Sequence, residues 1–400
     1  MLWKVKAPTP SFVGCPPQMA TRASIVIPTK NAGDGFRETL EAIQAQDPAP
    51  AELIVVDSGS VDGTPRLADS YGAKVLTIPP ESFNHGETRN LGLAAARGEI
   101  GVLLVQDAVP EGTNWLAEMI RPFENERVAG VSGAQTPRAD ADLVALWEVA
   151  YSRRVLGDEF RLQQVENWCS FLTASLPERL QMAAFNNVCS AVRRSCWEAQ
   201  PFRQLPFAED LDWGVRALEK GLCIAYNPAA RVIHSHNRSA SYDLRRHYLA
   251  WKTVPELLGA QDFESDIQGD REFRILAAAL CGEVESILEE RAADWRRLWE
   301  REECCELPPN FLRSWGGIFG LCAPPHSSTD NPMRRHFYSL LRELEAFDNS
   351  DTTGLTGRVL VRAMAQSIGH FAATYYKWCR ANQRVSRSMA LLDRALSARV

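Results

Sequence analysis

The 400-residue sequence lacks the features that usually identify secreted proteins, proteins with structural zinc sites and membrane-spanning proteins. Its ten cysteines form no CxxC pair, and the adjacent Cys304 and Cys305 have no companion pair, so we expect free thiols and no structural zinc site. No apolar run approaches the ~20 residues that a helix needs to cross a bilayer. The proline-rich start contains no apolar segment of the signal-peptide kind. These absences predict a cytoplasmic protein, either soluble or peripheral at the inner face of the cytoplasmic membrane.

Positive charge is also not in excess. The formal net charge is -6, which argues against a general nucleic-acid binder. A bound anion must therefore be met by local groups or by a metal ion. The length exceeds one ordinary domain, so we expect one large domain and an appendage.

Short apolar segments alternate with helical spacing in the first third of the chain. The expected strands cover residues 23–29, 53–57, 74–79, 100–105 and 128–135. Strands that alternate with helices in this way predict an α/β fold with a mostly parallel sheet covered by helices on both faces. Ligands of such sheets bind at the carboxyl ends of the strands, which is where Asp57 and Asp107 are expected.

The composition changes after about residue 245. A helix is expected at 211–220, followed by the strand CIAYNP and the segment RVIHSH, and beyond them Leu, Ala, Arg, Glu and Trp dominate. We therefore predict a lead-in over 1–20, an α/β domain over 21–245 and a helical region over 246–400. This region also contains tryptophans near arginines, namely Trp295, Trp299, Trp315 and Trp378. They could contact a membrane, or they could pack in the core and at oligomer contacts. We prefer the second alternative.

Six stretches of the first 237 residues, in this order, resemble the family 2 glycosyltransferases. They are SIVIPTKN (24–31), LIVVDSGSVDGT (53–64), TRNLGLAAARGE (88–99), LLVQDA (103–108), FAEDLDWGVRALEKG (207–221) and VIHSHN (232–237). FNHGETRN and QDA are most similar to the bacterial rhamnosyltransferase branch. The resemblance implies the GT-A nucleotide-sugar fold for the N-terminal domain.

The resemblance also implies an enzyme, an inverting and metal-assisted hexosyltransferase. Its donor would be a nucleoside-diphosphate sugar, with dTDP-L-rhamnose as the best single guess. Its acceptor would be a saccharide, free or lipid-linked, in the assembly of a surface polysaccharide, and homo-oligomers and peripheral membrane contact stay open. Two alternatives remain, namely a UDP-hexose donor and a catalytically degenerate nucleotide-sugar-binding scaffold.

Family members hold the nucleotide at the ends of the first two strands. The resemblance implies that Asp57 accepts a hydrogen bond from the imide N–H of a pyrimidine, with Pro28 and Thr29 at the end of the neighbouring strand. The alternative is that Asp57 caps a turn, since SGSVDGT is ordinary turn chemistry. Phosphate-binding candidates are His85, Arg89 and Asn90, in the first turn of a helix whose N–H groups and dipole suit an anion, and loop packing is their alternative.

The predicted metal site combines Asp107 with His234, and with His236 as the second choice. A divalent cation, Mg²⁺ or Mn²⁺, commonly neutralises a leaving diphosphate. Family members usually show Asp-x-Asp here, whereas this chain has Gln106-Asp107-Ala108, so metal dependence is less certain. The alternatives are a turn-capping Asp107 and hydrogen-bonded histidines that bind no metal.

The predicted catalytic base is Asp210. Inverting transfer needs a carboxylate that takes the proton of the acceptor hydroxyl, and the family's Glu-Asp motif places Asp210 in that role. Glu209 and Trp213 are the candidates for acceptor binding. The alternatives are a helix-capping carboxylate and a tryptophan of the core.

Overall fold

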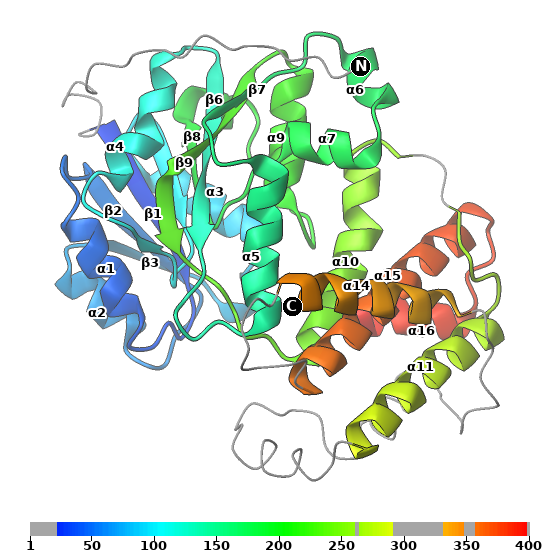
Figure 1. The fold of residues 1–400 in the computed structure, drawn as a ribbon. Helices are drawn as coiled ribbons and strands as arrows, with labels where there is room; N and C mark the ends of the chain where they lie inside the picture. Colours follow the sequence, from blue (N-terminus) through cyan, green and yellow to red (C-terminus); the bar gives the residue numbers. More distant parts are fainter. Residues whose placement is uncertain (1–21, 261–263, 291–330, 348–356, 398–400) are drawn as a thin grey trace.

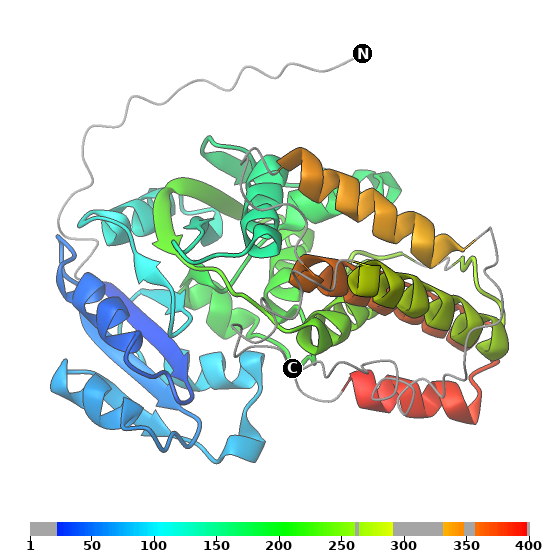
Figure 2. The same ribbon diagram turned by 60° about the horizontal axis from the view of Figure 1, so that its bottom comes forward.

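The computed structural model describes residues 22–260, 264–290, 331–347 and 357–397. Its N-terminal part is built around one large sheet, and a bundle of helices lies to one side of that sheet (Figures 1 and 2). The lead-in predicted over 1–20, and Trp295, Trp299 and Trp315, fall outside the described residues. In the part of the chain that is described, no helix combines the length and the apolar character needed to cross a bilayer.

The sheet contains nine strands in the order β3-β2-β1-β4-β8-β6-β9-β5, and β7 also pairs with β9. The strands are β1 (Ala23–Thr29), β2 (Glu52–Asp57), β3 (Lys74–Thr77), β4 (Ile100–Leu104), β5 (Val109–Pro110), β6 (Val128–Thr136), β7 (Arg161–Gln163), β8 (Cys189–Arg193) and β9 (Cys223–Ile233). The five strands expected before residue 136 are thus present. CIAYNP and the start of RVIHSH, expected as separate segments, form the single strand β9.

The sheet is parallel in its first half and mixed in its second. Strands β1 to β4 pair in parallel, whereas β8 is antiparallel to both β4 and β6. Strand β8 can run backwards because residues 137–188, which are mostly helical, leave β6 and bring the chain back to the same edge of the sheet at which β6 ends. The GT-A fold class is confirmed, with a sheet less uniformly parallel than expected.

Helices cover both faces of the sheet because each side of the strands is apolar. On one face α1 (Phe36–Gln44), α2 (Thr64–Ser70) and α4 (Trp115–Ile120) bury their apolar residues. On the other face lie α3 (His85–Ala95), α6 (Trp168–Thr173), α7 (Leu176–Ala183), α8 (Arg194–Ala199) and α9 (Glu209–Glu219). Helix α3 approaches very closely, because a Cβ at Gly92 would lie 2.2 Å from Cγ1 of Val26 in β1.

The C-terminal helices share a core of their own. Helix α15 (Gly357–Ala381) is almost entirely buried, with α10 (Ala240–Leu257), α11 (Asp270–Glu290) and α14 (Pro332–Phe347) in contact with it. Helix α16 (Arg387–Leu396) packs on α10. The core reaches the N-terminal part through Val144 of α5 (Leu143–Leu156). Helix α10 runs across residue 245, and the domain boundary there stays a prediction.

Candidate active site

Six strands run in one direction. Because β8 is antiparallel to both β4 and β6, and β9 is parallel to β6, strands β6 and β9 point the same way as β1 to β4. Their carboxyl ends therefore meet at one edge of the sheet. Asp57 ends β2, Asp107 follows β4 and His234 follows β9 directly, so residues up to 177 positions apart come to this edge.

Asp107, His234 and His236 form the candidate metal site. Nε2 of His234 lies 3.7 Å from Oδ1 of Asp107, and Nε2 of His236 lies 3.5 Å from Oδ2. One ligand atom from each residue lies within 4.8 Å of the others. Both histidines therefore face the same carboxylate, including the one that was the second choice.

Gln135 of β6 orients His234. Its Oε1 lies 2.8 Å from Nδ1 of His234, so Nδ1 carries the proton and donates it, which leaves the lone pair of Nε2 directed at Asp107. Burial lowers the pKa of His234 to about 4 despite the Asp107 carboxylate nearby. The imidazole is therefore neutral at pH 7, which is the form that binds metals. No sequence motif links Gln135 to His234, so the sequence analysis missed it.

The neighbours of Asp107 add no further ligand. Gln106 accepts a 2.8 Å hydrogen bond from the backbone N–H of Lys30, and Ala108 is fully buried without a polar side-chain atom. The donor set is one carboxylate and two imidazoles. Two nitrogen ligands fit a divalent ion that accepts imidazole better than one that requires oxygen ligands alone.

Asp210 lies in the first turn of α9, next to the start of β8. Ala208, the residue before the helix, has a left-handed conformation with φ 60°, an uncommon geometry that sets the direction in which Glu209 and Asp210 leave the turn. Asp210 accepts hydrogen bonds from the backbone N–H groups of Leu211 (2.8 Å) and Asn187 (3.1 Å). Burial and the adjacent Glu209 carboxylate nevertheless raise the pKa of Asp210 to about 6.

Strand pairing relates this carboxylate to the metal site. Val188 accepts a hydrogen bond from Val105 at the junction of β8 with β4, so Asn187 and Asp107 lie near the same point of the sheet edge. Asn187 is 1% exposed and binds Asp210 through its backbone. The sequence analysis missed Asn187, although it stands in an Asn-Asn pair just before a strand.

Glu209 and Arg89 form a buried ion pair. Nη1 of Arg89 donates to Oε1 of Glu209 at 2.9 Å, and the two side chains are 4% and 7% exposed. Arg89 also donates to the carbonyl of His85 at 3.1 Å, and Asn187 donates to Glu209 at 3.3 Å. The ion pair favours a structural role for both side chains, and phosphate binding by Arg89 and acceptor binding by Glu209 stay predictions.

The start of α3 is also less open than expected. Asn84 caps the helix by accepting hydrogen bonds from the N–H groups of Gly86 and Glu87. Asn90 binds the backbone of Phe202 through both ends of its amide, which favours the packing alternative for Asn90. His85 alone of the three phosphate candidates has an exposed side chain.

The hydrogen-bonding capacity of the Asp57 carboxylate is filled by neighbouring protein groups. One carboxylate oxygen accepts from the N–H groups of Gly59 and Ser60, and the other accepts from the hydroxyls of Ser60 and Thr29. A carboxylate offers about four acceptor positions, and all four are occupied here. The geometry favours the turn-capping alternative for Asp57. Pro28 and Thr29 pair with Val56 and Asp57 and so lie at the end of β1.

Trp213 contributes to packing. Its side chain has no exposed surface, its ring lies between Phe185 and Phe202, and its indole N–H donates to the carbonyl of Gln200 at 2.9 Å. Contact with an acceptor requires an exposed face, which Trp213 does not have. The burial therefore favours the core alternative for this residue.

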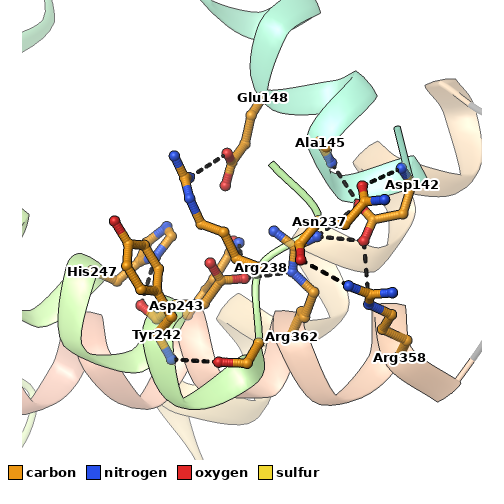
Figure 3. Close-up of polar contacts among 12 residues, drawn as sticks. Asp142, Ala145, Glu148, Asn237, Arg238, Tyr242, Asp243, His247, Arg358 and Arg362 are labelled. Atoms are coloured by element: carbon orange, nitrogen blue, oxygen red, sulfur yellow. Dashed lines mark hydrogen bonds and ion pairs between the residues drawn. The ribbon is translucent and has the colours of Figure 1, made fainter. Parts of the chain in front are cut away.

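The segment after His236 is held by the helical region. Asn237 accepts a hydrogen bond from the N–H of Asp142, and its carbonyl accepts one from Arg358 of α15 (Figure 3). Arg362, which is 1% exposed, donates to both carboxylate oxygens of Asp142 and to Asp243 of α10. The C-terminal helices thus help to fix the loop that carries both metal-site histidines.

Comparison with known proteins identifies the family of this chain. The family model described as Glycosyl transferase family 2 matches residues 24–173. The O-antigen chain rhamnosyltransferase WbaN of Salmonella anatum is 34% identical over 230 residues, 56% of this chain and 70% of that protein. The O-antigen chain rhamnosyltransferase RfbN of Salmonella typhimurium (strain LT2) is 28% identical over 235 residues, 57% of this chain and 70% of that protein.

The similarity of the chain to solved structures is weaker. The mannosyltransferase PcManGT of Pyrobaculum calidifontis, in complex with GDP-Man and Mn²⁺, is 20% identical and has a TM-score of 0.44, over 63% of this chain and 66% of that one. That similarity is too low to support an argument about function. The sequence relatives carry the assignment, and they confirm the predicted resemblance and enzyme class. With a 34% identical relative of which it covers 70%, the chain belongs to the family 2 glycosyltransferases and is a glycosyltransferase.

Proposed function

We propose that the chain transfers L-rhamnose, with inversion, from dTDP-L-rhamnose to a saccharide acceptor in the assembly of a surface polysaccharide. One observation carries the catalytic part of this proposal: Asp107, His234 and His236 converge at the sheet edge near which Asp210 also lies. The names of the two O-antigen rhamnosyltransferases support the choice of sugar. The cytoplasmic location and peripheral membrane contact stay predictions.

Each residue then has a defined task. Asp210 takes the proton of the acceptor hydroxyl while the hydroxyl oxygen attacks the anomeric carbon. Its raised pKa makes it a stronger base than an ordinary aspartate, yet leaves it mostly ionised at pH 7. Asp107, His234 and His236 would hold a divalent cation, which neutralises negative charge on the leaving diphosphate when it is bound.

A nucleotide titration tests this proposal. We expect Mn²⁺ to tighten the binding of dTDP to wild type relative to EDTA, because the metal and the diphosphate supply ligands to each other. Asp107→Ala should abolish this enhancement and His234→Ala should reduce it. Asp140→Ala is the matched control, since Asp140 is an exposed carboxylate outside the triad. Equal affinity in EDTA and Mn²⁺ would exclude a metal held by the triad.

A donor screen tests the identity of the donor sugar and whether the chain is a catalyst. A nucleotide sugar at 100 times its dissociation constant should stabilise the fold by ~2.7 kcal/mol. We expect this stabilisation with dTDP-L-rhamnose and less with UDP-glucose. The opposite order would support the UDP-hexose alternative, and hydrolysis of the preferred donor in the absence of an acceptor would separate a catalyst from a scaffold.

A further inference from the structure

Helix α10 carries two adjacent arginines with different surroundings. Arg245 is exposed, whereas Arg246 is half-buried, with its guanidinium over the ring of Phe207 at 5.5 Å from the ring centre. Phe207 precedes Asp210 by three residues, and α9 and α10 are in contact. The helical region therefore places a positive charge beside the turn that carries the predicted catalytic base.

The charge of Arg246 also acts on nearby imidazoles. Burial is the main cause of the lowered pKa of His234 and of His236, and the charge of Arg246 lowers both further. The same charge acts on His85, which also interacts with Asp210. These effects agree with the position of Arg246 over Phe207, three residues before Asp210.

The charged side chains at the junction of α5, α10 and α15 are already paired with one another (Figure 3). The pairs are Arg358–Asp142, Arg362–Asp142, Arg362–Asp243 and Arg238–Glu148. Three carboxylates thus balance three guanidinium groups. Among the residues that the structure describes, Arg246 forms no ion pair and no hydrogen bond, so none of these carboxylates is its partner.

A half-buried guanidinium without an anion loses hydration and gains little in return. The Phe207 ring attracts the guanidinium but accepts no conventional hydrogen bond, so the N–H groups of Arg246 can still donate to a ligand. Those donors match the oxygens of a phosphate group in a bidentate manner, which a lysine cannot reproduce. The position therefore suits a phosphate group of a substrate held beside the turn that carries Asp210.

We propose that Arg246 binds a phosphate group of a substrate and that the helical region thereby completes the active site. The inference rests on the proposed transferase function. The phosphate has two possible sources, the diphosphate of the donor nucleotide or the phosphate of a lipid-linked acceptor. A role for the C-terminal helices in substrate binding follows from either source.

Calorimetry on the full chain tests the proposal with four probes: thymidine, dTDP, inorganic pyrophosphate and farnesyl phosphate. Wild type is compared with Arg246→Gln, Arg246→Lys and the control Arg245→Gln, which removes the same charge from an exposed neighbour. Loss of charged hydrogen bonds to phosphate should weaken binding ~10-fold to 100-fold in Arg246→Gln. Arg246→Lys should fall between, and Arg245→Gln should match wild type.

The probes separate the possible results. Weaker binding of dTDP and pyrophosphate, with thymidine unchanged, assigns Arg246 to the donor diphosphate, and weaker binding of farnesyl phosphate alone assigns it to the acceptor. Unchanged affinity of Arg246→Gln for every phosphate probe overturns the inference. Failure of wild type to bind dTDP refutes the proposed donor instead, and pyrophosphate still decides the role of Arg246. If Arg246→Gln does not fold, Arg246→Lys carries the same comparison.

Discussion

Replacing Arg89 by methionine should reveal whether this residue serves the fold or the substrate. The substitution removes the guanidinium that pairs with Glu209 at 2.9 Å and leaves a carboxylate that is 7% exposed. Among the described residues, the 3.3 Å hydrogen bond from Asn187 is then the only side-chain contact left to the Glu209 carboxylate. Breaking one partner of a buried ion pair costs ~3–5 kcal/mol, because the other charge stays buried. We expect a loss of that size in the free energy of unfolding.

Urea unfolding followed by circular dichroism measures this loss, and a double-mutant cycle assigns it to the pair. Glu209→Gln alone should cost less, since the amide still accepts from Arg89. Arg89→Met combined with Glu209→Gln should be less destabilised than Arg89→Met by itself, with a coupling energy of ~0.5–3 kcal/mol. A loss under ~1 kcal/mol for Arg89→Met, or strictly additive effects, would refute the buried-pair account.

The same variants should shift the pH dependence of transfer in opposite directions. The Glu209 carboxylate raises the pKa of Asp210, while Arg89 lowers it. Activity should therefore rise at higher pH in Arg89→Met and at lower pH in Glu209→Gln. Nucleotide affinity should stay near the wild-type value in folded Arg89→Met, whereas a large loss of dTDP affinity would return Arg89 to the phosphate-binding role.

Two further predictions concern the base and the packing of α3. Asp210→Asn cannot take a proton, so turnover should fall ~10²-fold or more while the affinity for dTDP is unchanged. Steady-state kinetics measure this loss. Substantial remaining activity would show that Asp210 is not the catalytic base. In wild type, kcat/KM should rise as pH increases through about 6 and then level off, because only the ionised carboxylate accepts a proton; a profile that is flat between pH 5 and 8 would contradict this. Gly92→Ala should lower the free energy of unfolding by ~1–3 kcal/mol in urea titrations, because its Cβ would lie 2.2 Å from Val26 and 3.2 Å from Val56; an unchanged midpoint would show that α3 moves away freely.

The sequence alone determined the alternation of strands and helices and the position of Asp107 beyond a buried strand. These features depend on local patterns, since apolar runs and turn residues decide where a strand forms and ends. The pairing of His236 with Asp107 needed the path of β9, which the sequence describes only as two separate apolar segments.

The tertiary structure decided which polar groups are still available to a ligand. Asp57, Arg89 and Asn90 carry the right chemistry for a nucleotide, yet each is bound by protein groups. Arg89 meets Glu209 across 120 residues, and Arg246 packs over Phe207 from a helix that no motif connects with α9. A residue type shows what a side chain can bind, whereas its free hydrogen-bonding capacity depends on neighbours that only the folded chain brings together.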